Sequence, residues 1–138
     1  AERSGKLKPG GTLVEATSGN TGFSLAMVSA IKGYKCILTV TSKVSQEKIN
    51  LLKAMGAEVV ICPKEAKAED PNSYYKMAER IAAETPNAYY VNQNYDTGNM
   101  DAHYLSTGPE IWEQSDGQVT HLVGSTGTGG TMCGTARF

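Results

Sequence analysis

Residues 11–22, Gly11-Thr12-Leu13-Val14-Glu15-Ala16-Thr17-Ser18-Gly19-Asn20-Thr21-Gly22, contain the stretch that decides the fold. Its first half, 11–16, is partly β-branched and is entered through Pro9-Gly10-Gly11, so it predicts a strand. The following residues 23–31 are good helix formers and stop at Gly33, so they predict a helix. The hydroxyl-rich segment 17–22 therefore falls between the carboxyl end of a strand and the amino end of a helix.

This position favours a bound anion. Ligands of parallel α/β sheets bind at the carboxyl ends of the strands. Free N–H groups and the positive end of a helix dipole there attract a carboxylate or a phosphate. Thr17, Ser18, Asn20 and Thr21 add side-chain donors. The simpler alternative is an ordinary capped helix with two glycines in a tight turn, because Ser, Thr and Asn are common caps.

The next segments repeat the alternation of strand and helix up to about residue 93. Apolar runs predict further strands at 35–40, 58–62 and 88–93. Helical patterns lie between these runs. Ser45 is expected to cap the second helix, and Asp70-Pro71 are expected at the cap and first position of the third. Such alternation predicts an α/β fold with a parallel, doubly wound sheet in three layers and right-handed crossovers.

A second anion-binding signature closes the chain. Residues 120–125 predict a strand, and residues 132–137 predict the start of a helix. Between them, Gly127, Gly129 and Gly130 allow backbone N–H groups to converge on one point. Hydroxyl donors are added by two threonines, Thr128 and Thr131. The turn lacks the Walker lysine and the full dinucleotide fingerprint, so it predicts a phosphate-binding loop of another class.

Length, composition and charge limit the classes of protein to which this chain can belong. The chain has 138 residues, 40% of them hydrophobic and 20% charged, with a formal net charge of -1. This balance gives no reason to expect nucleic acid or an acidic membrane as a partner. No apolar run approaches the length of a membrane span. Cys36, Cys62 and Cys133 lie in apolar runs and predict buried free thiols in a reducing compartment, so we expect the cytoplasm. His103 and His121 are too far apart to predict a metal site.

Together the two motifs resemble the fold type II pyridoxal-phosphate enzymes of the cysteine synthase and cystathionine β-synthase family. The most specific matches are TSGNTG at 17–22 and GTGGT at 127–131. The similarity runs nearly end to end, and its other segments are 7–10, 33–34, 51–57, 107–112 and 116–117. Segments 69–75 and 99–104 are more similar to the cystathionine β-synthase branch than to plain cysteine synthase.

The resemblance implies a function and a set of site residues. It implies pyridoxal 5'-phosphate as cofactor, a small amino acid as substrate, and a homodimer as the complete enzyme. The implied ligands of the substrate carboxylate are Thr17, Ser18, Gly19, Thr21 and Gln93. Asn20 is implied to bond the ring hydroxyl of the cofactor, and the implied ligands of its 5'-phosphate are Gly127, Thr128, Gly129, Gly130 and Thr131. For Gln93 the alternative is a solvated polar residue at a strand end.

The implied reaction belongs to sulfur amino acid metabolism. In this family a thiol replaces the β-substituent of serine or O-acetylserine, and the cofactor serves as the electron sink. The chain alone is expected to contain no catalytic residue. The family's Schiff-base lysine would precede Ala1, and the serine that bonds the pyridine nitrogen would follow Phe138. Lys6 and Lys8 match the end of a family helix and the segment that follows it, so we expect both lysines at the surface.

These matches predict the middle part of a longer enzyme, inactive by itself. Residues 1–97 would form the small mobile domain that carries the carboxylate loop. Residues 98–138 would open the large domain that binds pyridoxal phosphate, and they include the phosphate loop. The alternative from another class is a non-catalytic ligand-binding or interaction module that kept both loops.

Overall fold

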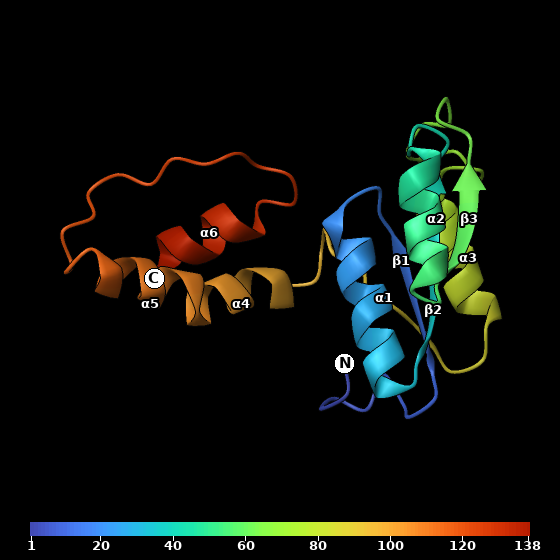
Figure 1. The fold of residues 1–138 in the computed structure, drawn as a ribbon, viewed down its shortest axis with the longest axis horizontal. Helices are drawn as coiled ribbons and strands as arrows, with labels where there is room; N and C mark the ends of the chain where they lie inside the picture. The colour runs from blue at the N-terminus through green and yellow to red at the C-terminus, as the bar shows by residue number, and fades with distance from the viewer. The chain divides into compact units, whose positions relative to one another are not determined.

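A parallel sheet of four strands forms the centre of residues 1–91 in the computed structural model, which describes all of residues 1–138 (Figure 1). The strands are β1 (Thr12–Ala16), β2 (Lys35–Thr41), β3 (Glu58–Cys62) and β4 (Ala88–Tyr90). Their order in the sheet is β3-β2-β1-β4. In the register of β1, Thr12 lies opposite both Lys35 and Ala88. The predicted parallel α/β sheet is confirmed.

Helices cover both faces of this sheet. α1 (Asn20–Lys32) and α2 (Gln46–Ala54) pack on one face, where Ala26 and Leu52 meet Leu38. α3 (Tyr74–Glu84) packs on the other face, where Ala78 meets Val14 and Ala16. Successive strand residues point to opposite faces, so a strand buried on both sides reads as a continuous apolar run. The result is the predicted three-layer arrangement.

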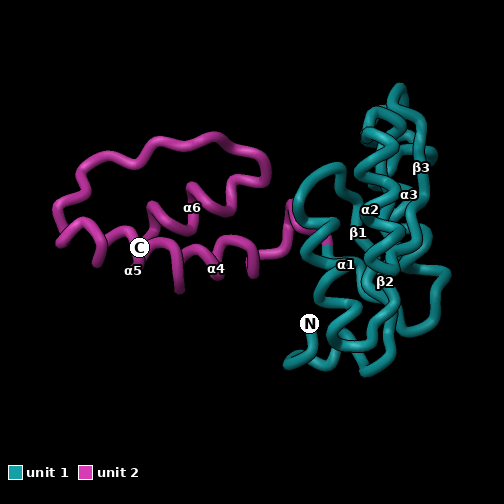
Figure 2. Tube along the Cα trace, viewed as in Figure 1, with its two compact units in different colours: residues 1–91 teal, residues 92–138 magenta.

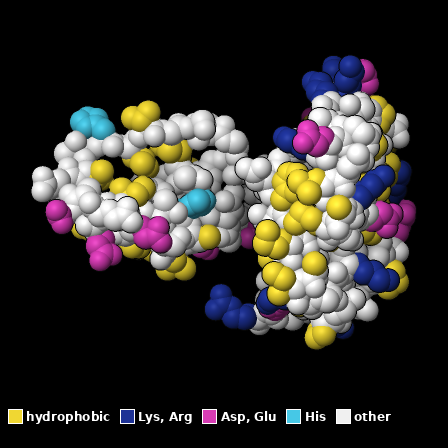
Figure 3. All heavy atoms as spheres, in the orientation of Figure 1, with side chains coloured by type: hydrophobic (Ala, Val, Ile, Leu, Met, Phe, Trp, Pro, Cys, Tyr) yellow, Lys and Arg dark blue, Asp and Glu magenta, His cyan; other side chains and the backbone are white.

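Small residues bring α1 close to the sheet. Its buried positions are Gly22, Ala26 and Ser29. A Cβ at Gly22 would lie 3.1 Å from Thr17 Cγ2 and 3.3 Å from Leu38 Cδ1, so a larger residue would push the helix start away from the strand end. Phe23 and Leu25 of α1 pack against the core, whereas Met27, Val28 and Ile31 are exposed. Figure 3 shows hydrophobic atoms over this helix.

Residues 92–138 form a second unit that contains helices and no strand (Figure 2). Its helices are α4 (Gly98–Leu105), α5 (Thr107–Gln114) and α6 (Gly130–Arg137). A Cβ at Gly130 would overlap the Asn99 side chain, and one at Gly134 would overlap the carbonyl of Met100. Glycine at these two positions therefore lets α6 lie against α4. The prediction of a domain boundary at residue 97 stays a prediction.

Two local predictions fail in the structure. Residues 120–125 form no strand, because this unit offers no strand edge with which their backbone could pair. The third helix begins after Ser73, whose side chain accepts a hydrogen bond from the Lys76 N–H. Asp70 instead accepts from the N–H of Asn72, and so stabilises the turn before the helix.

Other predictions are confirmed in part. Ser45 caps α2 by accepting from the Lys48 N–H, as predicted. Cys36 and Cys62 are buried free thiols, and burial raises the pKa of each. Cys133 is exposed, contrary to prediction, because it lies on an outer face of α6. β4 ends at Tyr90, three residues before the predicted end. No helix has both the length and the apolar character that crossing a membrane would need.

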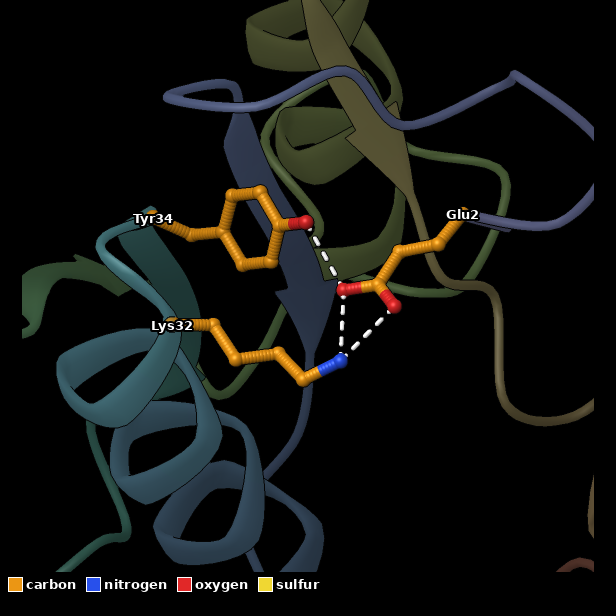
Figure 4. A network of polar contacts seen from close by, with 3 residues as sticks. All are labelled: Glu2, Lys32 and Tyr34. Carbon is orange, nitrogen blue, oxygen red and sulfur yellow. Dashed lines mark hydrogen bonds and ion pairs between the residues drawn. The ribbon is translucent and has the colours of Figure 1, made fainter.

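A polar contact fixes the amino-terminal segment to the end of α1 (Figure 4). Lys32 Nζ donates to both carboxylate oxygens of Glu2 at 2.8 and 2.7 Å. Tyr34 Oη donates to Glu2 Oε1 at 2.7 Å. These hydrogen bonds hold the pKa of Glu2 below its ordinary value, and the bond from Lys32 has the larger effect. The contact is exposed, so we expect a small effect on stability that depends on pH and salt.

The first prediction concerns the core. Leu38 is fully buried between the sheet and α1. Leu38→Ala should lower the free energy of unfolding by about 2–5 kcal/mol, because it leaves a cavity. Urea denaturation of the complete protein measures this change. The control is Ile31→Ala on the outer face of α1, where the side chain is 77% exposed. Equal effects of the two variants would contradict the assigned core.

The second prediction concerns pH. The folded-state pKa of Glu2 is lowered, so its stabilisation is present above the ordinary pKa of glutamate and is lost as pH falls through the lowered value. Glu2→Gln should therefore lower the urea midpoint at neutral pH and leave it unchanged in acid. Glu69→Gln in an exposed loop is the control. A midpoint difference that persists in acid would contradict this linkage.

Candidate functional site

The loop at the end of β1 starts from a fixed backbone. The N–H of Thr17 donates to the Thr39 carbonyl at 3.0 Å and so extends the pairing of β1 with β2 by one residue. Thr17 is 5% exposed, and its Oγ1 accepts from the Gly19 N–H at 3.2 Å. Beneath the loop, the buried carboxylate of Glu15 accepts from the Ala16 N–H. Ser18, Gly19 and Asn20 then follow as exposed residues.

The helix after this loop has no side-chain cap. Gly19 is the N-cap residue of α1 and has extended backbone angles. No side chain accepts a hydrogen bond there as a cap. The simpler alternative, in which Ser, Thr or Asn of this loop caps α1, is therefore wrong. Asn20, Thr21 and Gly22 belong to the first turn of the helix, in which the Gly22 N–H donates to the Gly19 carbonyl at 3.3 Å.

Positive charge lies next to the loop. Ser18 lines a hollow of about 380 Å³ together with Lys43, Ser45 and Lys48. The hollow includes the amino end of α2, so the helix dipole adds to the charge of the two lysines. An incoming carboxylate is therefore favoured at Ser18. These lysines could not be identified from the sequence, because their proximity to Ser18 follows from the pairing of β1 with β2.

The glycine-rich turn before α6 presents a second set of donors. Gly129 is the N-cap residue of α6, in a left-handed conformation with φ of 82° that favours glycine. The first helical hydrogen bond runs from the Cys133 N–H to the Gly129 carbonyl. The N–H groups of Thr131 and Met132 precede it, so they have no carbonyl partner within α6. A Cβ at Gly127 would meet no atom within 4 Å, so space is open beside this turn.

Side chains of α4 hold the threonines of this turn. Asn99 Nδ2 donates to Thr128 Oγ1 at 2.7 Å. His103 Nε2 lies 3.0 Å from Thr131 Oγ1. From the sequence, His103 was considered only as a metal ligand and rejected, and Asn99 was given no role. No local signal distinguishes them, since their partners lie 29 and 28 residues further along the chain.

Gln93 lies in a turn after β4 and not at the strand end as predicted. It lines a hollow of about 180 Å³ with Asn99 and three residues of the turn, Thr128, Gly129 and Gly130. Within the second unit, the structure therefore brings Gln93 together with part of the predicted phosphate loop.

The donors around the glycine turn fit a phosphate group. They combine an uncapped helix start, a left-handed glycine and two hydroxyl groups that α4 holds in place. Phosphates bind at helix amino ends of this kind. Residues 124–134, which form the turn and the helix start, contain no acidic side chain, although Asp96 lines the hollow beside them. This donor set suits the 5'-phosphate of a cofactor.

Residues 1–138 match the family described as "Pyridoxal-phosphate dependent enzyme". The chain belongs to this family. It is 48% identical to the cystathionine beta-synthase of Rattus norvegicus over 137 residues, which are 99% of this chain and 24% of that protein. It is 47% identical to cysteine synthase 1 of Neurospora crassa over 138 residues, 100% of this chain and 36% of that protein.

A bacterial relative gives the same result. The chain is 43% identical to cysteine synthase B of Escherichia coli over 139 residues, 100% of this chain and 44% of that protein. The predicted family and its pyridoxal 5'-phosphate cofactor are thus confirmed. The chain spans less than half the length of each of these relatives. The residue roles within the family stay predictions.

Proposed function

We propose that the complete protein is a pyridoxal-phosphate-dependent β-replacement enzyme of sulfur amino acid metabolism. It exchanges the β-substituent of serine or O-acetylserine for a thiol. The observation that carries this proposal is the uncapped start of α1 at Gly19, because it leaves donors for a carboxylate at the end of a parallel strand. The membership of the whole chain in the family supports it.

The residues of this chain would bind and orient. In the proposed roles, Thr17, Ser18, Gly19 and Thr21 hold the substrate carboxylate through backbone and hydroxyl donors, with the charge of Lys43 and Lys48 nearby. Gln93 is proposed as a further carboxylate ligand and Asn20 as the partner of the cofactor's ring hydroxyl. Residues 127–131 would hold the 5'-phosphate. The bound cofactor supplies the electron sink that this chemistry requires.

Several finer properties belong to the same proposal. We place the complete enzyme in a reducing cytoplasm as a homodimer, with a small amino acid as its substrate. The two buried free thiols support a reducing compartment. The choice between the cystathionine β-synthase and cysteine synthase reactions depends on the thiol. The sequence identities to the two kinds of relative, 48% and 47%, are too similar to decide it.

An assay of the complete protein tests the function. The enzyme loaded with pyridoxal phosphate should form product from serine plus homocysteine or from O-acetylserine plus sulfide. Residues 1–138 alone should form none, since none of their lysines matches the Schiff-base position of the family. If the complete protein binds the cofactor and forms neither product, the non-catalytic ligand-binding module is the better account.

The carboxylate loop gives a sharper prediction. Ser18→Ala and Gln93→Ala in the complete enzyme should each weaken amino acid binding roughly ten-fold or more, because a hydrogen bond to a charged group contributes about 1.5–3 kcal/mol. Cofactor content should stay unchanged, and spectral titration of the bound cofactor with the amino acid measures both quantities. Ser4→Ala and Gln118→Ala change the same residue types at exposed positions and serve as controls. Normal binding by both site variants would refute the assigned roles.

A further inference from the structure

The two hydroxyl groups of the glycine turn are both held from one helix. Asn99 and His103 are four residues apart on α4, so they lie on the same face of this helix. Asn99 contacts the hydroxyl of Thr128, and His103 contacts that of Thr131. The four-residue spacing on α4 therefore places one side chain next to each of the two threonines of the turn.

The contacts of Thr128 determine what its hydroxyl can still do. A threonine hydroxyl has one proton to donate and two lone pairs that accept. Thr128 Oγ1 accepts from Asn99 Nδ2 at 2.7 Å and from the Gly130 N–H at 3.4 Å. Both accepting positions are thus used. The hydroxyl proton is left to donate to a ligand, and an acceptor such as a phosphate oxygen is the matching partner.

The contacts of His103 also allow the Thr131 hydroxyl to keep its proton for a ligand. Its Nε2 lies 3.0 Å from Thr131 Oγ1, and its Nδ1 lies 2.9 Å from Thr107 Oγ1. A neutral imidazole carries one proton, which makes one nitrogen a donor and the other an acceptor. With the proton on Nε2, His103 donates to Thr131 and accepts from Thr107. The proton of the Thr131 hydroxyl is then free to donate to an anion.

We propose that Asn99 and His103 are positioning residues that make Thr128 and Thr131 hydrogen-bond donors toward the cofactor's phosphate. In this arrangement His103 donates to the Thr131 hydroxyl from Nε2. This inference rests on the proposed binding of the 5'-phosphate at residues 127–131. It adds that α4, which does not belong to the glycine turn, sets the direction of both hydroxyl protons.

The packing of α6 on α4 is part of this arrangement. Gly130 leaves the space that the Asn99 amide occupies, and a Cβ at Gly134 would lie 2.7 Å from His103 Cβ. The two glycines therefore set the distance at which the α4 side chains reach the threonines. At the far end of the same helix pair, Arg137 lies over the Tyr104 ring, 5.3 Å from its centre.

Double-mutant cycles in the complete apoenzyme test the inference. Thr131→Val should weaken pyridoxal phosphate binding roughly ten-fold, because it removes one hydrogen bond to a charged group. His103→Leu should weaken binding by a similar factor, because the Thr131 hydroxyl then loses the contact that orients it. Together they should weaken it little more than either alone, since His103 acts through the Thr131 hydroxyl. The same non-additivity is expected for Asn99→Leu with Thr128→Val. Equilibrium dialysis measures the affinities.

A conservative variant and a control separate positioning from packing. His103→Gln should restore most of the affinity, because its amide can donate from near the place of Nε2. Tyr104→Leu disturbs the contact of α4 with Arg137 without touching a threonine, so its effect should add fully to that of Thr131→Val. Full additivity of His103→Leu with Thr131→Val would overturn the inference.

Two spectroscopic signals give a readout that does not depend on the cofactor affinity. In the wild-type holoenzyme, long-range ¹H–¹⁵N spectra should show His103 protonated on Nε2, with the signal assigned through His103→Gln. The ³¹P resonance of the bound cofactor should shift in Thr131→Val and in His103→Leu by similar amounts. A proton on Nδ1 would overturn the inference. An apoenzyme that binds no pyridoxal phosphate at all would instead refute the proposed function.

Discussion

The parallel pairing of β1 on both of its edges is the constraint on which the first unit depends. β1 pairs with β2 on one side and with β4 on the other, and every one of its residues is buried. Because both partners are parallel, the carboxyl ends of all these strands lie at one edge of the sheet. The loop at Thr17 therefore starts from a backbone that neighbouring strands hold in place. The hydrogen bond from the Thr17 N–H to the Thr39 carbonyl extends the strand pairing one residue beyond β1.

In the second unit, which has no sheet, the glycine turn is also held in a fixed geometry. Its glycine turn gains fixed geometry from the close contact of α6 with α4, which Gly130 and Gly134 permit. Hydrogen bonds from Asn99 and His103 then hold the two threonines of the turn. Close packing of helices at small residues thus replaces strand pairing as the source of rigidity. Such pre-organisation would favour the binding of a phosphate, the ligand that we propose for this loop.

Local signals in the sequence were enough to predict most of the first unit. β2, β3 and the cap of α2 at Ser45 each depend on residues that are neighbours along the chain. The prediction of Asp70 as the cap of α3 was wrong, because Asp70 and Ser73 can each accept from a backbone N–H within a few residues. Sequence pattern alone does not rank two such competing local hydrogen bonds.

Features that depend on distant partners could not be predicted. Residues 120–125 have the apolar pattern of a strand, yet a strand forms only where another edge accepts its hydrogen bonds. The roles of Asn99 and His103 were missed for a related reason. Each is an ordinary polar residue on a helix until the fold brings residues 128–131 next to it.

The helices of this chain begin either with or without a side chain that accepts a hydrogen bond from the helix backbone. α2 and α3 begin at Ser45 and Ser73, whose side chains accept from the backbone and so use donors that a ligand would need. α1 and α6 begin at Gly19 and Gly129, which have no side chain to cap with. Replacing a serine cap by glycine costs only a few tenths of a kcal/mol, roughly, so leaving these donors open is a small loss for the fold. The Thr128 hydroxyl accepts from the Gly130 N–H, and its proton stays available to donate to an anion.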